Sequence, residues 1–138
     1  TVEVAEDDAG PQIHLSVRVT NTGDCTGSEV VQLYLQDRVS GLARPVQELK
    51  GFDKVSLASG ASQVVQFRVG PRALAFFDPL QDAWIVEAGE FQARFASSSR
   101  DVRQRVDFTV ARSYRLDVRR GSRWTTPAAR STCGTPPW

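Results

Sequence analysis

The feature that most constrains this chain is an alternation of apolar and polar side chains near its start. Residues 13–20 place Ile13, Leu15, Val17 and Val19 between His14, Ser16, Arg18 and Thr20. A period of two puts neighbouring side chains on opposite faces of a β-strand, one toward a core and one toward water. The sequence is therefore predicted to build half-buried strands, and it has no convincing amphipathic helix.

Further strands are predicted wherever apolar residues alternate or cluster between turn signals rich in Gly, Pro, Asn, Asp and Ser. With the first, the predicted strands number about seven, at residues 13–20, 29–37, 48–57, 63–69, 84–86, 91–95 and 102–110. A single helical turn is expected over residues 73–77. The uneven spacing of Leu49 and Phe52 across Gly51 predicts a β-bulge. The fold class is thus all-β, an antiparallel sandwich of two sheets.

The core of such a sandwich is formed by the inward side chains of both sheets. The large aromatic residues are the expected fillers, because each can bury 150 Å² or more. We predict as core residues Val17, Val19, Leu33, Phe52, Phe67, Trp84, Phe91 and Phe95.

Length and composition limit the remaining possibilities. The chain has 138 residues, 41% of them hydrophobic, which suits one domain with a tail. No stretch approaches the roughly 20 apolar residues of a membrane helix, and basic residues are interleaved with acidic ones rather than forming a nucleic-acid surface. The chain has no Met, so we expect it to be a piece of a longer polypeptide or a trimmed product.

The end of the chain differs in composition. Residues 112–138 contain six arginines and a single acidic residue, Asp117. We predict a folded domain over residues 1–111 and an irregular or disordered tail over 112–138, with an edge strand at 114–118 as the alternative. An inert tail is favoured over a tether to polysaccharide or to an anionic surface.

No catalytic or metal site is predicted. The carboxylate pairs Asp78/Asp82 and Glu87/Glu90 flank turns and are interpreted as solvated loop residues. Residues 6–8 (Glu-Asp-Asp) form an acidic lead-in segment rather than a calcium site, which needs six or more oxygens from several segments. His14, on the polar phase of its strand, is expected at the surface.

The two cysteines do not predict a disulfide framework or a metal site. Cys25 lies in a turn and Cys133 in the tail, and neither has a thiol or histidine at ligand spacing. The cysteines therefore do not indicate whether the chain works in an oxidising or a reducing compartment. No cofactor is predicted.

Several ordered motifs are familiar as a set. They are VRVTNTG at 17–23, GSEVVQLYL at 27–35, RPVQELKGFDKV at 44–55, LAFFD at 74–78, WIVEAGEF at 84–91 and SSSRDVR at 97–103. Over about residues 12–110 the chain resembles the fibronectin type III-like domain that ends many family 3 glycoside hydrolases, the β-glucosidases and β-xylosidases. It departs from that pattern at Ala88, where Pro is usual, and at Ala96, where Gly is usual.

The resemblance implies a fibronectin type III-like sandwich without catalytic residues of its own, because the catalytic carboxylates of that family lie in upstream domains. It implies an accessory role in which the chain contacts the catalytic domains of a parent hydrolase. Polysaccharide is a second possible partner. The alternative is a stand-alone module that binds carbohydrate or protein; an enzyme in its own right is the weakest hypothesis. A periplasmic or secreted location would follow from a parent that acts on glycans, and a cytoplasmic one stays open.

The resemblance also places a docking surface on this chain. The polar loop from residue 38 to 50 and the outer face of the strand before it are the expected contacts. The interface candidates are Val30, Tyr34, Arg44, Pro45 and Glu48. A local Arg44–Glu48 ion pair and an ordinary crossover loop are the alternatives for this segment.

Overall fold

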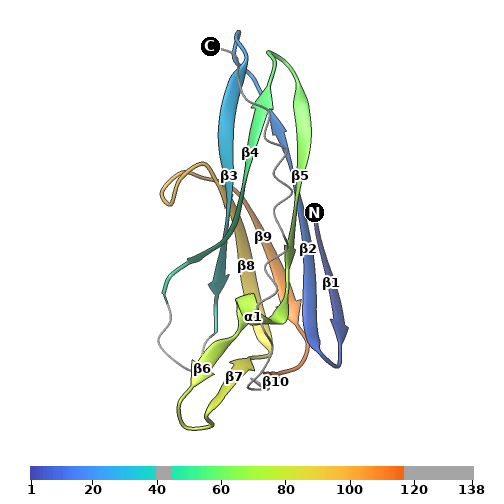
Figure 1. The fold of residues 1–138 in the computed structure, drawn as a ribbon, viewed down its shortest axis with the longest axis vertical. Helices are drawn as coiled ribbons and strands as arrows, with labels where there is room; N and C mark the ends of the chain where they lie inside the picture. The colour runs from blue at the N-terminus through green and yellow to red at the C-terminus, as the bar shows by residue number, and fades with distance from the viewer. Residues whose placement is uncertain (40–44, 117–138) are drawn as a thin grey trace, which may run out of the picture.

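Two antiparallel β-sheets face each other in the computed structural model, which describes residues 1–39 and 45–116 (Figure 1). The first, called here the β2 sheet, has the order β1-β2-β5. The second, the β3 sheet, has the order β4-β3-β8-β9. Their strands are β1 (Val2–Asp7), β2 (Gly10–Thr20), β5 (Ser62–Val69), β4 (Glu48–Leu57), β3 (Gly27–Asp37), β8 (Gly89–Ala96) and β9 (Val102–Val110).

A small third sheet projects from the lower end of the sandwich in Figure 1, beside a single helical turn. Its order is β10-β7-β6, formed by Tyr114–Leu116, Ala83–Val86 and Phe76–Asp78. The helical turn, α1, comprises Pro71–Leu74, and proline suits its first position because that amide has no partner within a helix. Within the described residues, no helix is long and apolar enough to cross a membrane.

The antiparallel sandwich and all seven predicted strands are confirmed, two further strands were missed, and a third was given only as an alternative. β1 lies in the segment interpreted as an acidic lead-in, where charged side chains are tolerated because the strand is at a sheet edge and largely exposed. β6 occupies part of the predicted helical turn, which begins two residues earlier than expected. β10 is the possible edge strand of the tail.

The core lies between the two main sheets. Of the predicted core residues, Val17, Leu33, Phe67, Phe91 and Phe95 are buried. Val19 and Trp84 are only partly buried and pack against the edge of the core. The prediction of a β-sandwich core is therefore confirmed for most of its members.

Phe52 was wrongly predicted to be in the core: 71% of it is exposed. The predicted bulge is present and explains the error. The ladder between β3 and β4 shifts so that Leu33 pairs with Gly51 while Tyr34 pairs with Leu49, which leaves Lys50 as the extra residue. Gly51 therefore faces the core, where a Cβ atom would lie 3.1 Å from the Phe67 ring, and Phe52 faces outward.

The two ends of the described domain are held together by a polar cluster. The Glu6 carboxylate accepts hydrogen bonds from the Ala111 amide (2.8 Å) and the Tyr114 hydroxyl (2.7 Å). These bonds, led by the one from Ala111, lower the pKa of Glu6. Arg112 donates a hydrogen bond to the Tyr114 hydroxyl (2.9 Å) and forms an ion pair with Asp8 at 3.4 Å.

The predicted boundary at residue 111 is therefore too early. Tyr114 is buried, and β10 pairs with β7 from Tyr114 opposite Val86 to Leu116 opposite Trp84. The folded part extends at least to Leu116. The rest of the predicted tail, residues 117–138 with Cys133, lies outside the described residues.

Candidate interaction surface

The outer face of the β3 sheet, which points away from the core, holds the most organised group of polar side chains in the described part of the chain. Antiparallel partners share a face, so the register of the sheet defines its members. They include Val30, Gln32, Tyr34 and Gln36 from β3, Leu49 and Phe52 from β4, and Gln92 and Arg94 from β8. We call this set the outer face.

Arg94 is the centre of this surface. Its guanidinium donates from Nε to Gln92 (2.8 Å), from Nη1 to Gln47 (3.0 Å) and from Nη2 to Gln36. Gln92 in turn donates to Asp107 on β9 at 2.7 Å. The rigid Arg94 guanidinium thus links β8 to β3 and to Gln47 just before β4, and Gln92 extends the network to β9. These hydrogen bonds hold the side chains of the outer face in place without a partner.

Tyr34 lies beside Arg94 in the register, and only 8% of it is exposed. Its hydroxyl donates to Gln32 at 2.6 Å, and Gln32 donates to the carbonyl of Ser97 at 3.2 Å. Val30 and Tyr34 lie on the outer face, as predicted, and their role as interface contacts stays a prediction. Tyr34 is covered by its neighbours, and Val30 is half-buried.

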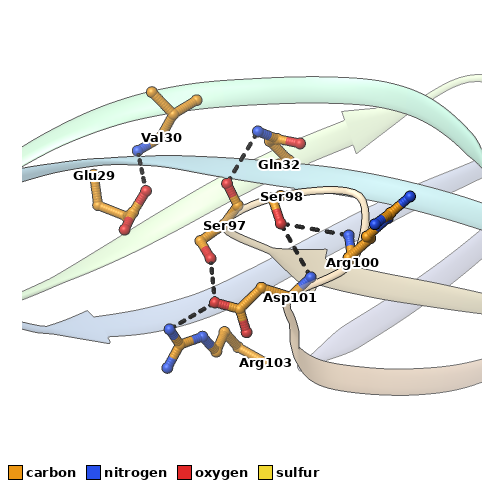
Figure 2. Close-up of polar contacts among 8 residues, drawn as sticks. All are labelled: Glu29, Val30, Gln32, Ser97, Ser98, Arg100, Asp101 and Arg103. Carbon is orange, nitrogen blue, oxygen red and sulfur yellow. Dashed lines mark hydrogen bonds and ion pairs between the residues drawn. The ribbon is translucent and has the colours of Figure 1, made fainter.

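The turn at residues 97–101 supports one side of this surface (Figure 2). The Ser97 hydroxyl donates to the Asp101 carboxylate at 2.7 Å, and Arg103 donates to the same oxygen at 2.7 Å. These two bonds, that of Ser97 first, lower the pKa of Asp101. The carbonyls of Ser97 and Ser99 then accept from Gln32 and Gln47, so the closed turn positions two side chains of the outer face.

The exposed apolar side chains of this surface lie on its β4 edge. Phe52 is 71% exposed and Leu49 is 50% exposed, and Val46 just before the strand is exposed too. We call Leu49 and Phe52 the β4 apolar pair. The signal for them was present in the sequence, because a bulge between two apolar residues three positions apart places both on one face. What the sequence did not show was which face that is.

Two of the other interface candidates, Glu48 and Pro45, do not join this surface. Glu48 pairs with Leu35, a core residue, so it points to the inner side of the sheet, where Lys50 contacts it at 2.5 Å. Pro45 and Glu48 line a small pocket with Leu74 at the lower end of the sandwich. Arg44 lies outside the described residues, so the Arg44–Glu48 pairing is untested.

Two of the carboxylates considered for chemistry, Asp78 and Asp7, close turns. Asp78 accepts from the amide of Leu80 (2.9 Å) and from Gln81 (2.7 Å), which closes the turn after β6. Asp7 caps the turn to β2 by accepting from Ala9 and Gly10. His14 is exposed, as predicted, and Cys25 is exposed too. Across residues 1–39 and 45–116, no three His, Cys, Asp or Glu side chains gather where they could hold a metal ion.

Comparison with known proteins matches residues 29–99 to the fibronectin type III-like domain family. β-Glucosidase BoGH3A of Bacteroides ovatus is 46% identical over 96 residues, which are 70% of this chain and 13% of that enzyme. Thermostable β-glucosidase B of Acetivibrio thermocellus is 44% identical over 90 residues, 65% of this chain and 12% of that enzyme. The chain thus spans about an eighth of the curated relatives it matches.

Solved structures match in the same way. A crystal structure of a β-glucosidase from Kluyveromyces marxianus in complex with glucose superposes with a TM-score of 0.78 and 36% identity. The match covers 84% of this chain and 14% of that protein.

Proposed function

This chain belongs to the fibronectin type III-like domain family, and we propose that it is a non-catalytic domain of a family 3 β-glucosidase-like hydrolase that packs on and stabilises the catalytic domains. The observation that carries the proposal is the β4 apolar pair, exposed beside an organised polar surface. The similarity to β-glucosidases over a small part of their length supports the choice of partner.

The outer face has the composition of a protein interface. Tyr and Arg are enriched in such surfaces, and a few anchor residues supply most of the binding energy. Here Tyr34 and Arg94 are held in place by Gln32, Gln36 and Gln92, so little side-chain entropy is lost on docking. Leu49 and Phe52 would each remove apolar area from water when a partner covers them.

A carbohydrate-binding role has weaker support. Sugar rings stack on exposed aromatic faces, and among the described residues Trp84 is the largest aromatic residue outside the core centre. The Arg72 guanidinium lies 3.6 Å from the centroid of its ring, and the Phe77 ring meets it edge to face at 5.7 Å. A sugar would have to displace that stacked cation, so protein docking is preferred.

A chimaera tests the proposal. The 96 matched residues of the B. ovatus enzyme would be replaced by the corresponding part of this chain, with and without Leu49→Ser and Phe52→Ser together. We expect the double variant to lower the chimaera's Tm and the half-life of its β-glucosidase activity, because the interface loses apolar contact. The matched control is Val64→Ser, which removes an exposed apolar side chain (48%) from the other main sheet.

The outcomes separate clearly. A loss with the double variant and none with the control supports docking through the outer face. Equal behaviour of the double variant, the control and the unmodified chimaera would overturn it. The same substitutions in the chain alone must leave its Tm unchanged, which shows that any loss in the chimaera arises at the interface.

A further inference from the structure

β1 covers only the lower half of β2 (Figure 1). The ladder between them runs from Asp7 opposite Gly10 to Val2 opposite Leu15, and its last pair is Thr1 with Ser16. The amide of Ser16 donates to the Thr1 carbonyl at 2.9 Å, and the Thr1 amino group donates to the Ser16 carbonyl at 2.7 Å. Beyond Ser16, residues 17–20 of β2 pair with β5 on one side only.

Ladder bonds alternate from side to side along a strand. Ser16 bonds toward β1, so the N–H and C=O groups of Arg18 and Thr20 point the same way, into a position that no described strand fills. Such an edge readily accepts another extended segment.

A groove lies beneath this open edge. Its volume is about 540 Å³, and it runs between the upper part of β2 and the start of β9. Val17 and Val19 form one wall, Leu57 and Phe95 belong to the floor, and Arg103 and Gln104 line the β9 side. In the lower half, β1 lies between β2 and β9 and closes the same gap.

We propose that the groove and the open edge bind an extended segment that continues β1 past Thr1, and that this segment is the end of the linker from the catalytic domains. The inference rests on the proposed function, which takes the chain to be one part of a longer hydrolase. Continuity of the ladder supports this occupant, because a β-conformation carried backward from Thr1 runs antiparallel to residues 17–20.

The register fixes the chemistry of the segment. Val2 pairs with inward-facing Leu15, and Thr1 pairs with Ser16 on the solvent side. The first residue before Thr1 therefore stands opposite Val17 and the third opposite Val19, and both point into the groove. The segment has apolar side chains at these two positions and polar ones between.

Two extensions of the full chain test this register. One adds Ser-Val-Ser-Val before Thr1, with valines at the first and third preceding positions; the matched control adds Val-Ser-Val-Ser, which has the same composition slipped by one residue. We expect the in-phase extension to raise the Tm by roughly 5–10 °C and the control by less than half as much. Residue-resolved hydrogen exchange should slow about tenfold or more at the Arg18 and Thr20 amides with the in-phase extension alone.

Equal effects of the two extensions, or unchanged exchange at Arg18 and Thr20, would overturn the proposal. Dimerisation of the unextended chain that the in-phase extension abolishes would also overturn it, because a second copy would then be the occupant. So would faster exchange at these amides after deletion of residues 117–138, which would make the chain's own end the occupant.

The source of the segment is tested in the chimaera. Exchange over residues 17–20 should be slower there than in the unextended chain, and it should stay slow in the Leu49→Ser, Phe52→Ser double variant. Failure of docking and failure of strand addition are therefore distinguishable, because each is measured at a different surface. Unchanged exchange over residues 17–20 in the chimaera would exclude the linker as occupant.

Discussion

The inner and outer faces of the β3 sheet are formed by the same strands but differ in how far their apolar side chains are buried. On the inner face, Leu33, Phe91 and Phe95 are almost fully buried, because the β2 sheet covers them. On the outer face, Tyr34 is 8% exposed, while Leu49 and Phe52 remain exposed. The chain buries the large apolar residues of the inner face by itself, but it leaves those of the outer face exposed.

The difference shows that a side chain can be buried on a sheet face that still exposes large apolar residues. Tyr34 stands between Leu49 and Arg94 in the register, its hydroxyl is held by Gln32, and Arg94 is held by glutamines on the same face. Such a network orders side chains without hiding much apolar area. A surface ordered in this way and bordered by exposed apolar groups is suited to a partner.

The largest expected effect lies on the inner face. Phe95→Ala removes a buried ring that meets Phe67 with centroids 6.0 Å apart. We expect the free energy of unfolding to fall by about 3–5 kcal/mol, from lost transfer energy and the cavity left behind. Urea denaturation of the full chain measures it, with Val64→Ala on the exposed side of β5 as control. A loss below about 1 kcal/mol would contradict the assignment of the inner face as the core.

The second effect tests the bulge that separates the two faces. Gly51→Val adds a side chain where even a Cβ atom would lie 3.1 Å from Phe67. We expect a loss of about 1–3 kcal/mol, because the ring must move in a packed core. The control is Gly27→Ala, whose Cβ would meet only the Asn21 amide at an ordinary 3.8 Å. If both variants are equally stable, Gly51 does not face the core.

The sequence predicted most of the fold because alternation depends only on local chemistry. It predicted seven strands and the presence of a bulge, yet it assigned Phe52 to the wrong face, since a bulge resets the phase and only pairing with β3 shows where. β1 was missed because an exposed edge strand needs no apolar alternation. The polar contacts of the outer face could not be predicted, because Gln32 meets Ser97 and Arg94 meets Gln47 only through the tertiary fold.

The third effect tests the polar cover of the outer face. Tyr34→Phe removes the hydroxyl that donates to Gln32. We expect a loss of about 1 kcal/mol, the usual net value of one hydrogen bond. A double-mutant cycle with Gln32→Met isolates the pair, and the coupling should account for most of the single-variant loss. A coupling near zero would mean that the two side chains are ordered independently.

The fourth effect is a pH dependence. The pKa of Asp101 is lowered in the folded chain, so its contribution to stability is present above the ordinary aspartate pKa near 4 and is lost as pH falls below it. Glu6, with its own lowered pKa, adds to the same acid loss. We expect Asp101→Asn to lower the Tm at pH 7 and to flatten its fall between pH 5 and about pH 3. Asp24→Asn, in an exposed turn, removes the same charge as control; identical pH profiles for the two variants would count against the role of the 97–101 turn.

The smallest effect concerns the β4 apolar pair. Phe52→Ser in the chain alone should change the free energy of unfolding by no more than about 0.5 kcal/mol, because most of the ring already contacts water. Calorimetry of Phe52→Ser and of Phe95→Ala compares two phenylalanines of the same sheet, both predicted from the sequence to be core residues. We expect their losses in the free energy of unfolding to differ by several kcal/mol. A loss above about 2 kcal/mol would show that Phe52 packs within the domain. A neutral result would show that the Phe52 ring has no role in folding, which the proposed docking surface requires.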